Sequence, residues 1–350
     1  MIAFAIGGEV SPECGRPSDV HDGWRISSPE QQGLDAGMLC AMGKGVVDGK
    51  LPNVDSIVVV RHGAVVYERY FNYPNHSSFD ATVKHDGNSM TKSVVSLLVG
   101  IAMDRGLIDD LDASIFSYFP EYASLRTPAK DRITLRNLLT MSAGLNSTLA
   151  HPILHHDRDP YRHALEQSLA RAPGVAFEYN GAATELIGAV LQKASGKPVD
   201  ALARENIFEP LGINDVDWHG RLSNGVPTSS TGLSLRPRDW AKIGQLVLNR
   251  GAWQGKQIVP ASWIAQSTAE QIKGARKPLS YGFQWWLGRS RIEGRVVEWI
   301  AAMGFNAQKV VIVPGLDMIV VFNASLESVQ MVAPEIQLLD KYILPALSKD

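Results

Sequence analysis

The chain has 350 residues, of which 45% are hydrophobic and 20% charged, and its formal net charge is −2. These proportions are those of an ordinary globular protein that is long enough for a sizeable core and two lobes. The nearly balanced charge gives no reason to expect a nucleic acid or an anionic membrane surface as partner. No uncharged apolar run approaches the roughly 18 residues that a membrane helix needs, so we expect no membrane span.

The first ten residues, MIAFAIGGEV, are apolar but have no basic residue ahead of the apolar part. As written they do not predict a signal peptide, and the compartment stays open, with export as one alternative. Cys14 and Cys40 are the only cysteines, and their spacing matches no metal or redox motif. Two free thiols are the simpler expectation, and a single disulfide bridge in an oxidising compartment is the alternative.

The first third of the chain predicts a lead-in, a hairpin and a buried helix. Residues 1–30 contain three prolines and scattered glycines, and we expect them to be irregular. Residues 56–71 are two β-rich runs that meet at His62-Gly63, which predicts a hairpin. Residues 87–106, GNSMTKSVVSLLVGIAMDRG, are apolar on almost every side, as expected for a helix that runs through a core.

After about residue 111 the pattern is mostly helical, and it returns to strands near the end. Capping residues and terminal glycines predict further helices at residues 134–144, 181–196 and 236–251. β-Branched runs between glycine-containing turns predict strands at residues 295–303, 307–315 and 316–325, followed by a last helix at about 329–347.

Because strands occur near both ends of the chain, with helices between them, we predict an α+β fold. One antiparallel sheet is built from both chain ends and flanked by helices, and a mostly helical lobe is inserted in the middle. In this division residues 1–30 are the lead-in, residues 31–110 and 226–350 form the sheet domain, and residues 111–225 form the helical domain. The active site is expected between the two lobes.

Lys92 stands in the first turn of the apolar helix, three residues after Ser89. Positions three apart share a helix face, so the two side chains are expected to be neighbours. The helix dipole and the apolar surroundings both disfavour a charged ammonium, and an amine in that setting can take the proton of a serine hydroxyl. The simpler alternative is that Ser89 caps the helix and Lys92 reaches solvent, since about one S-x-x-K match is expected by chance.

The segment SMTKSVVSLLVGIAMDRGLIDDLDASIFSYFPEY resembles the active-site segment of the serine β-lactamase-fold hydrolases. This group holds class C β-lactamases, D-alanyl-D-alanine peptidases, β-lactamase-like esterases and aminohexanoate-oligomer hydrolases. Further blocks look like those of the family and follow in its order: ITLRNLLTMSAGL, PGVAFEYNGAATELIGAVLQKASG, GLSLRPRDWAKIGQLVLNRGAWQGKQIVPASWI and YGFQWWL. Together they cover most of residues 30–345, and they imply a β-lactamase/transpeptidase-like fold.

The resemblance also implies roles for single residues. Ser89 matches the nucleophile, Lys92 its lysine partner, and Tyr179 the family's tyrosine, which acts with the lysine as general base. The late motif AMG is followed by FNAQ, and in the family the residue after this glycine provides the second backbone N–H of the oxyanion hole. Phe305 is at that position, so its N–H is expected to form the oxyanion hole together with the N–H of Ser89. The residues expected to bind the substrate are Asn180, Gly304 and Trp286, with packing across a sheet face as the alternative for Trp286. We expect neither a metal nor an organic cofactor.

Two departures from class C β-lactamases bear on the substrate. Their tyrosine motif is Tyr-x-Asn, whereas here Asn180 follows Tyr179 directly. Their Lys-Thr-Gly lysine and threonine, which help to hold a β-lactam carboxylate, are replaced by Ala302 and Met303. An apolar strand end cannot make charge-assisted hydrogen bonds to that carboxylate, so a neutral ester or an amide fits better.

The sequence therefore predicts a serine hydrolase that cleaves a small-molecule ester or amide through an acyl-enzyme. The main alternative is a β-lactamase or D-alanyl-D-alanine carboxypeptidase. A catalytically weak penicillin-binding-like ligand sensor ranks below it. Nothing in the sequence predicts the oligomeric state.

Two other features support weaker hypotheses. The segment HPILHHDRDPYRH contains His151, His155, His156 and His163. It has no H-E-x-x-H arrangement and is interrupted by prolines, so we expect it to line the substrate cleft rather than to bind a metal. Glu185 lies in the helix after Tyr179, where a solvent-exposed position is expected rather than a general base.

Overall fold

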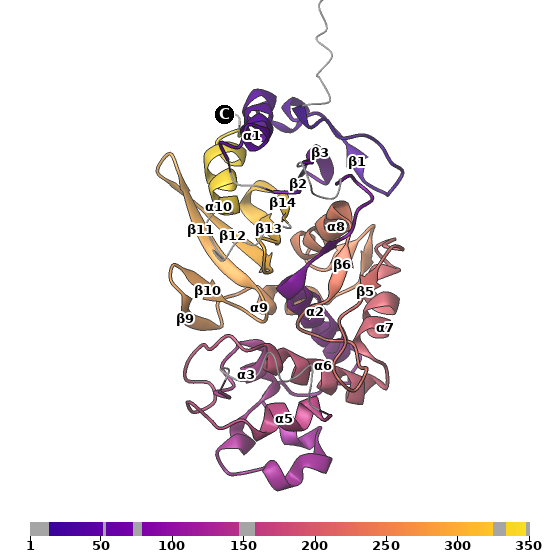
Figure 1. Ribbon diagram of the computed structural model, residues 1–350, viewed down its shortest axis with the longest axis vertical. Coiled ribbons are helices and arrows are strands. Elements are labelled where there is room, and N and C mark those ends of the chain that lie inside the picture. Colours follow the sequence, from indigo (N-terminus) through magenta and orange to yellow (C-terminus); the bar gives the residue numbers. More distant parts are fainter. Residues whose placement is uncertain (1–13, 52–53, 73–78, 147–157, 325–333, 348–350) are drawn as a thin grey trace, which may run out of the picture.

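The computed structural model describes residues 14–51, 54–72, 79–146, 158–324 and 334–347. The strands of its main sheet are β1 (Arg25–Ile26), β2 (Ser56–Arg61), β3 (Ala64–Tyr70), β9 (Ile272–Arg276), β10 (Leu279–Tyr281), β11 (Trp286–Ile292), β12 (Arg295–Met303), β13 (Lys309–Val313) and β14 (Met318–Asn323). Their order across the sheet is β1-β3-β2-β14-β13-β12-β11-β10-β9 (Figure 1). Strands from both chain ends therefore meet where β2 pairs with β14, as the sequence predicts.

The middle of the sheet is buried on both faces. β2, β13 and β14 are nearly continuous β-branched runs, which is the pattern of strands that are covered on both sides. Neighbouring strands pair antiparallel, except that β1 pairs parallel with β3. Within this main sheet, the predicted antiparallel pairing is therefore wrong only at this edge. The edge strand, β1, comes from the lead-in segment.

Helices lie on opposite faces of the sheet. α8 (Pro237–Leu248) packs against β2, β13 and β14, and Val310 of β13 points toward it. The next residue back, Lys309, points the other way and pairs with Glu335 of α10 (Pro334–Leu338) at 2.6 Å. Since successive strand residues point to opposite faces, α8 and α10 cover different faces of the sheet.

α2 (Thr91–Asp104) is the core helix that the apolar run predicts. Every residue from Thr91 to Ala102 is buried. The helices packed against it are α6 (Gly181–Ser195), α7 (Val199–Ala203) and α9 (Ala261–Ser267). Its start differs from the prediction, because Ser89 lies in a 3₁₀ turn, Asn88–Met90, just ahead of the α-helix.

The remaining predicted helices are present with different ends. α3 (Leu135–Leu139) begins after the expected cap, Thr134, but ends well before Gly144. α6 ends as expected at Gly196, which takes the left-handed conformation with φ of 71°. At the end of the chain α10 continues into a π-helical turn over Leu339–Ile343, and residues 329–333 of the expected last helix lie outside the described residues.

Cys14 and Cys40 form a disulfide bridge. The expectation of two free thiols is therefore wrong, and the alternative of a single disulfide bridge is found. Because Cys40 lies on α1 (Ala36–Val47), the bridge fastens the lead-in to this helix, which lies beside α10 (Figure 1).

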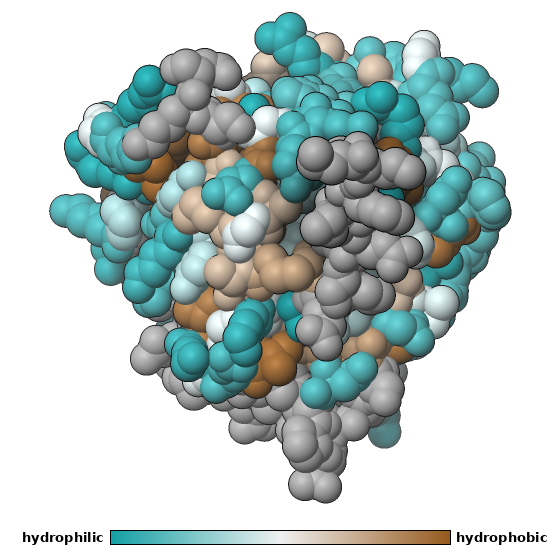
Figure 2. Space-filling model, turned by 90° about the horizontal axis from the view of Figure 1, so that it is seen from above, coloured by the Kyte–Doolittle hydropathy of each residue, from teal (hydrophilic) through white to brown (hydrophobic). Residues whose placement is uncertain are grey.

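The surface is mixed in character. The face seen in Figure 2 carries mostly hydrophilic side chains, with hydrophobic ones in small groups between them. None of the helices in the described ranges has the length and apolar character needed to cross a membrane.

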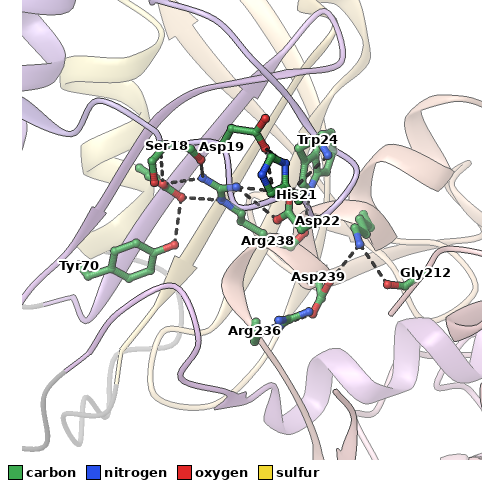
Figure 3. A network of polar contacts seen from close by, with 12 residues as sticks. Ser18, Asp19, His21, Asp22, Trp24, Tyr70, Gly212, Arg236, Arg238 and Asp239 are labelled. Carbon is green, nitrogen blue, oxygen red and sulfur yellow. Dashed lines mark hydrogen bonds and ion pairs between the residues drawn. The ribbon is translucent and has the colours of Figure 1, made fainter. Parts of the chain in front are cut away.

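A buried polar network ties the lead-in to β3 and α8 (Figure 3). Arg238 donates to both carboxylate oxygens of Glu68, at 2.7 and 2.6 Å, and to the Ser18 carbonyl oxygen at 2.7 Å. Asp22 lies 3.3 Å from the same guanidinium. The Arg238 and Glu68 side chains are only 3% and 7% exposed, so removing one of them leaves a buried charge without its main partner.

We expect Glu68→Ala to lower the free energy of unfolding by about 3–5 kcal/mol, because the buried guanidinium of Arg238 loses its bidentate partner. Glu166→Ala is the matched control, since its pair with Arg162 is about half exposed and should contribute less than about 1 kcal/mol. Urea titration measures both. Equal, small losses in the two variants would contradict this account of the network.

Candidate active site

Ser89 is presented on a sharp turn between a short strand and α2. β4 (His85–Asp86) pairs with β6 (Leu233–Leu235), and the chain then turns through Asn88, whose φ of 49° is left-handed. Asn adopts this conformation more readily than most residues. Asp86 accepts a hydrogen bond from the backbone N–H of Asn88 at 2.8 Å. The turn leaves Ser89 partly exposed at the entrance of the helix.

Lys92 is buried beside Ser89. The residue is only 2% exposed, and its Nζ lies 2.9 Å from Ser89 Oγ and 2.6 Å from the Ser230 carbonyl oxygen. The Lys92 side chain donates hydrogen bonds to both oxygens, which fixes its Nζ against the serine hydroxyl. The predicted proximity of serine and lysine is found, and the alternative in which Lys92 reaches solvent is wrong.

Tyr179 lies across from Lys92, in the loop just before α6. Its ring centroid is 5.2 Å from Lys92 Nζ, and its ring stacks on Trp286 with centroids 6.0 Å apart. Phe177 and Tyr281 complete an aromatic cluster around Trp286. Burial, reinforced by Tyr179, raises the pKa of Tyr281, which keeps that phenol neutral. The cluster holds the Tyr179 ring over the amine.

Trp286 and Asn180, both predicted to bind the substrate, make contacts within the protein. Trp286 is only 4% exposed, which favours the packing alternative, and its contact with a substrate stays a prediction. Asn180 is 5% exposed. Its side-chain oxygen accepts from the backbone N–H of Ala182 at 2.9 Å, and its amide nitrogen donates to the Leu145 carbonyl oxygen at 3.3 Å. Asn180 therefore caps α6.

The end of β12 reaches the turn that carries Ser89 from the sheet side. Gly304 packs so closely that an added Cβ would lie 2.1 Å from the Gly87 carbonyl oxygen. Phe305 follows it and is 49% exposed, and its carbonyl oxygen accepts from Asn88 Nδ2 at 3.3 Å. The structure thus brings the 304–305 turn next to the turn that carries Ser89.

The strand end beside the site is apolar. Ala302 and Met303 are 1% and 7% exposed. Lys309, the residue directly across from Met303 on β13, is fully buried, and its ammonium pairs with Glu335 at 2.6 Å. Glu335 neutralises this cation inside the protein, so Lys309 does not replace the missing lysine of the Lys-Thr-Gly motif.

The sequence analysis predicts the wrong environment for Glu185 and does not identify Ser230 as a partner of Lys92. Glu185 is 2% exposed, so the expected solvent-exposed position is wrong. Its two carboxylate oxygens accept from the backbone N–H groups of Ser229 and Ser230, at 2.7 and 3.0 Å. A signal was present, because GAATELIGAVL is apolar except for Thr184 and this one carboxylate. Ser230 binds Lys92 through its backbone carbonyl oxygen, and a backbone contact leaves no mark in a sequence.

No group of three or more His, Cys, Asp or Glu suited to a metal occurs among the described residues. His151, His155 and His156 lie outside them. His163 is on α5 (Pro160–Glu166), where its ring lies 3.0 Å from the amide nitrogen of Gln167. That the histidine-rich segment lines the substrate cleft therefore stays a prediction.

The Beta-lactamase family model matches residues 44–335, a span that holds Ser89, Lys92, Tyr179 and Gly304. The chain belongs to the Beta-lactamase family.

Relatives in this family carry the names of different hydrolases. The chain is 24% identical over 298 residues to the 6-aminohexanoate-dimer hydrolase of Paenarthrobacter ureafaciens, covering 76% of this chain and 71% of the relative. It is 27% identical over 212 residues to esterase EstB of Burkholderia gladioli, covering 53% of each chain. The family and these relatives indicate a hydrolase with the β-lactamase fold.

The fold itself is that of the solved family structures. A penicillin-binding protein homologue from Caulobacter crescentus superimposes with a TM-score of 0.74 at 16% identity, over 91% of this chain and 98% of that chain. The predicted β-lactamase/transpeptidase-like fold is confirmed.

We expect Gly304→Ala to lower the free energy of unfolding by about 1–3 kcal/mol, because the new methyl group would push β12 away from the Gly87 carbonyl. Gly315→Ala is the control, since a Cβ there meets open space, and it should change stability by less than about 0.5 kcal/mol. Thermal or urea unfolding measures both. A Gly304 variant as stable as the control would mean that β12 and the turn that carries Ser89 are not in tight contact.

Proposed function

We propose that the protein hydrolyses an ester or amide through an acyl-enzyme formed on Ser89. The observation that carries the proposal is the 2.9 Å contact between Lys92 Nζ and Ser89 Oγ, made by a lysine that is 2% exposed. Among the described residues no carboxylate forms an ion pair with Lys92. A buried amine placed this way is well suited to exchanging a proton with the neighbouring serine.

In acylation, Ser89 Oγ attacks the substrate carbonyl carbon while its proton passes to Lys92, with Tyr179 sharing the role of general base. The tetrahedral oxyanion is held by the backbone N–H groups of Ser89 and Phe305. The carbon–oxygen or carbon–nitrogen bond to the leaving group then breaks, and Tyr179 returns the proton to the departing atom. Water, deprotonated by the same groups, attacks the acyl carbon and releases the acid and free Ser89.

A neutral acyl substrate fits the strand end better than a β-lactam. Ala302 and Met303 offer no charge, and Lys309 is paired with Glu335, so a substrate carboxylate placed there would lose its hydration without gaining a cation. The names of two relatives, an esterase and a 6-aminohexanoate-dimer hydrolase, support the two bond types that we propose.

A β-lactamase or D-alanyl-D-alanine carboxypeptidase activity is the second candidate, and the structural similarity to a penicillin-binding protein homologue favours it. The two candidates share the Ser89 chemistry and differ in what the β12 end must bind. A ligand sensor that stays acylated is the third, and it differs from both in its slow release of the acid.

We expect the protein to hydrolyse a short p-nitrophenyl ester, and Ser89→Ala to lower kcat by about a thousandfold or more, because the nucleophile is lost. Hydrolysis of a chromogenic cephalosporin should be slow or absent. The control is Ser96→Ala on the same helix, where the buried hydroxyl has no hydrogen-bond partner in the described part of the chain, and it should keep the wild-type rate.

Three outcomes would count against the proposal. Ester turnover that survives in Ser89→Ala would rule out this serine as nucleophile. Faster turnover of the cephalosporin than of the ester would favour the β-lactamase alternative. A stoichiometric burst with no steady-state turnover on either substrate would favour the sensor.

A further inference from the structure

A buried carboxylate lies behind the lysine, and the mechanism above does not use it. Glu185 is on the second turn of α6 and is 2% exposed. It accepts hydrogen bonds from the backbone N–H of Ser229 at 2.7 Å, from the backbone N–H of Ser230 at 3.0 Å, and from the Ser230 hydroxyl. Both oxygens are therefore engaged by one short stretch of backbone.

The same stretch of backbone binds Lys92. The Ser230 carbonyl oxygen accepts from Lys92 Nζ at 2.6 Å. Ser230 therefore contacts both the Glu185 carboxyl group and the Lys92 amine. α6 and the 229–230 segment are also pressed together at Gly188, where an added Cβ would lie 1.7 Å from Ser229 Oγ. The segment has little room to shift while Glu185 holds it.

We propose that Glu185 is a positioning residue for the lysine. By holding the backbone of residues 229–230, it fixes the Ser230 carbonyl that orients the Lys92 amine toward Ser89. The inference rests on the proposed function, because it assigns Glu185 a part in activating Ser89.

Burial and hydrogen bonding act in opposite directions on the Glu185 carboxyl group. Burial raises its pKa, and the hydrogen bonds from Ser230 and Ser229 and the charge of Lys92 offset that rise only in part. The positioning role does not depend on the charge, because a carboxyl group keeps acceptor capacity for the two backbone N–H groups in either protonation state. Besides Lys92 on α2, the ionisable group that interacts with Glu185 is Tyr161 on α5, whose pKa is raised by burial and by Glu185.

Loss of the 229–230 anchor should lower kcat, because a misdirected amine no longer meets the serine hydroxyl. KM should change little, because Glu185 is buried behind Lys92.

The test compares three variants with the wild type on the p-nitrophenyl ester. Glu185→Gln removes half of the anchor at nearly constant volume. Gly188→Ala displaces the 229–230 segment but keeps the carboxylate. Thr184→Val, the control, removes a buried hydrogen bond to Gln284 from the neighbouring position of α6 and touches neither Lys92 nor the segment. Each variant is measured for kcat, KM and melting temperature.

We expect Glu185→Gln to lower kcat about tenfold or more, with KM little changed. Gly188→Ala should lower kcat in the same way. Thr184→Val should lower the melting temperature and leave kcat and KM of the folded enzyme as in the wild type.

Failure of the inference is distinguishable from failure of the proposed function. If ester turnover persists in Ser89→Ala, the proposed function and this inference fall together. If turnover depends on Ser89 but Glu185→Gln keeps the wild-type kcat, the inference alone is overturned. It is also overturned if Thr184→Val lowers kcat as far as Glu185→Gln does, or if Glu185→Gln raises KM instead of lowering kcat. Should Glu185→Gln not fold, Gly188→Ala decides, and an unchanged kcat there would overturn the positioning role.

Discussion

The contact between a buried lysine and a partly exposed serine is the constraint on which the rest of this structure depends. An amine at the entrance of a fully buried helix is costly unless other groups fill its hydrogen bonds. The Ser230 carbonyl and the Ser89 hydroxyl do so for Lys92. The apolar sides of α2 lock the helix among α6, α7 and α9. Neither side chain can therefore move away from the other without disturbing the core.

The sheet brings its own part of the site to that pair. Because β2 and β14 pair in the middle of the sheet, the two ends of the chain form one sheet. The end of β12 places Gly304 against the turn that carries Ser89. A glycine is required there, since any side chain would separate the strand from Ser89. The two residues just before it, Ala302 and Met303, are buried and apolar. The strand end beside Ser89 therefore offers no charged group to a substrate.

Much of this could be read from local patterns in the sequence, and the rest depends on contacts between distant segments. The turn at His62-Gly63, the stop of α6 at Gly196 and the proximity of Ser89 and Lys92 all follow from spacing of a few residues. Glu185, by contrast, is a lone carboxylate whose partners are backbone groups 44 and 45 residues away. The parallel pairing of β1 and the Cys14–Cys40 bridge likewise join segments that no periodicity connects. Ser229 and Ser230 contribute backbone groups, which any residue has.

The most direct test of the central claim is to trap the covalent intermediate. The protein is mixed with a p-nitrophenyl ester, quenched in acid during turnover, and weighed by intact-protein mass spectrometry, and the modified peptide is then mapped. The account predicts a mass increase equal to one acyl group, located on Ser89 and absent from Ser89→Ala. Turnover with no acylated protein, or an acyl group on another residue, would contradict it.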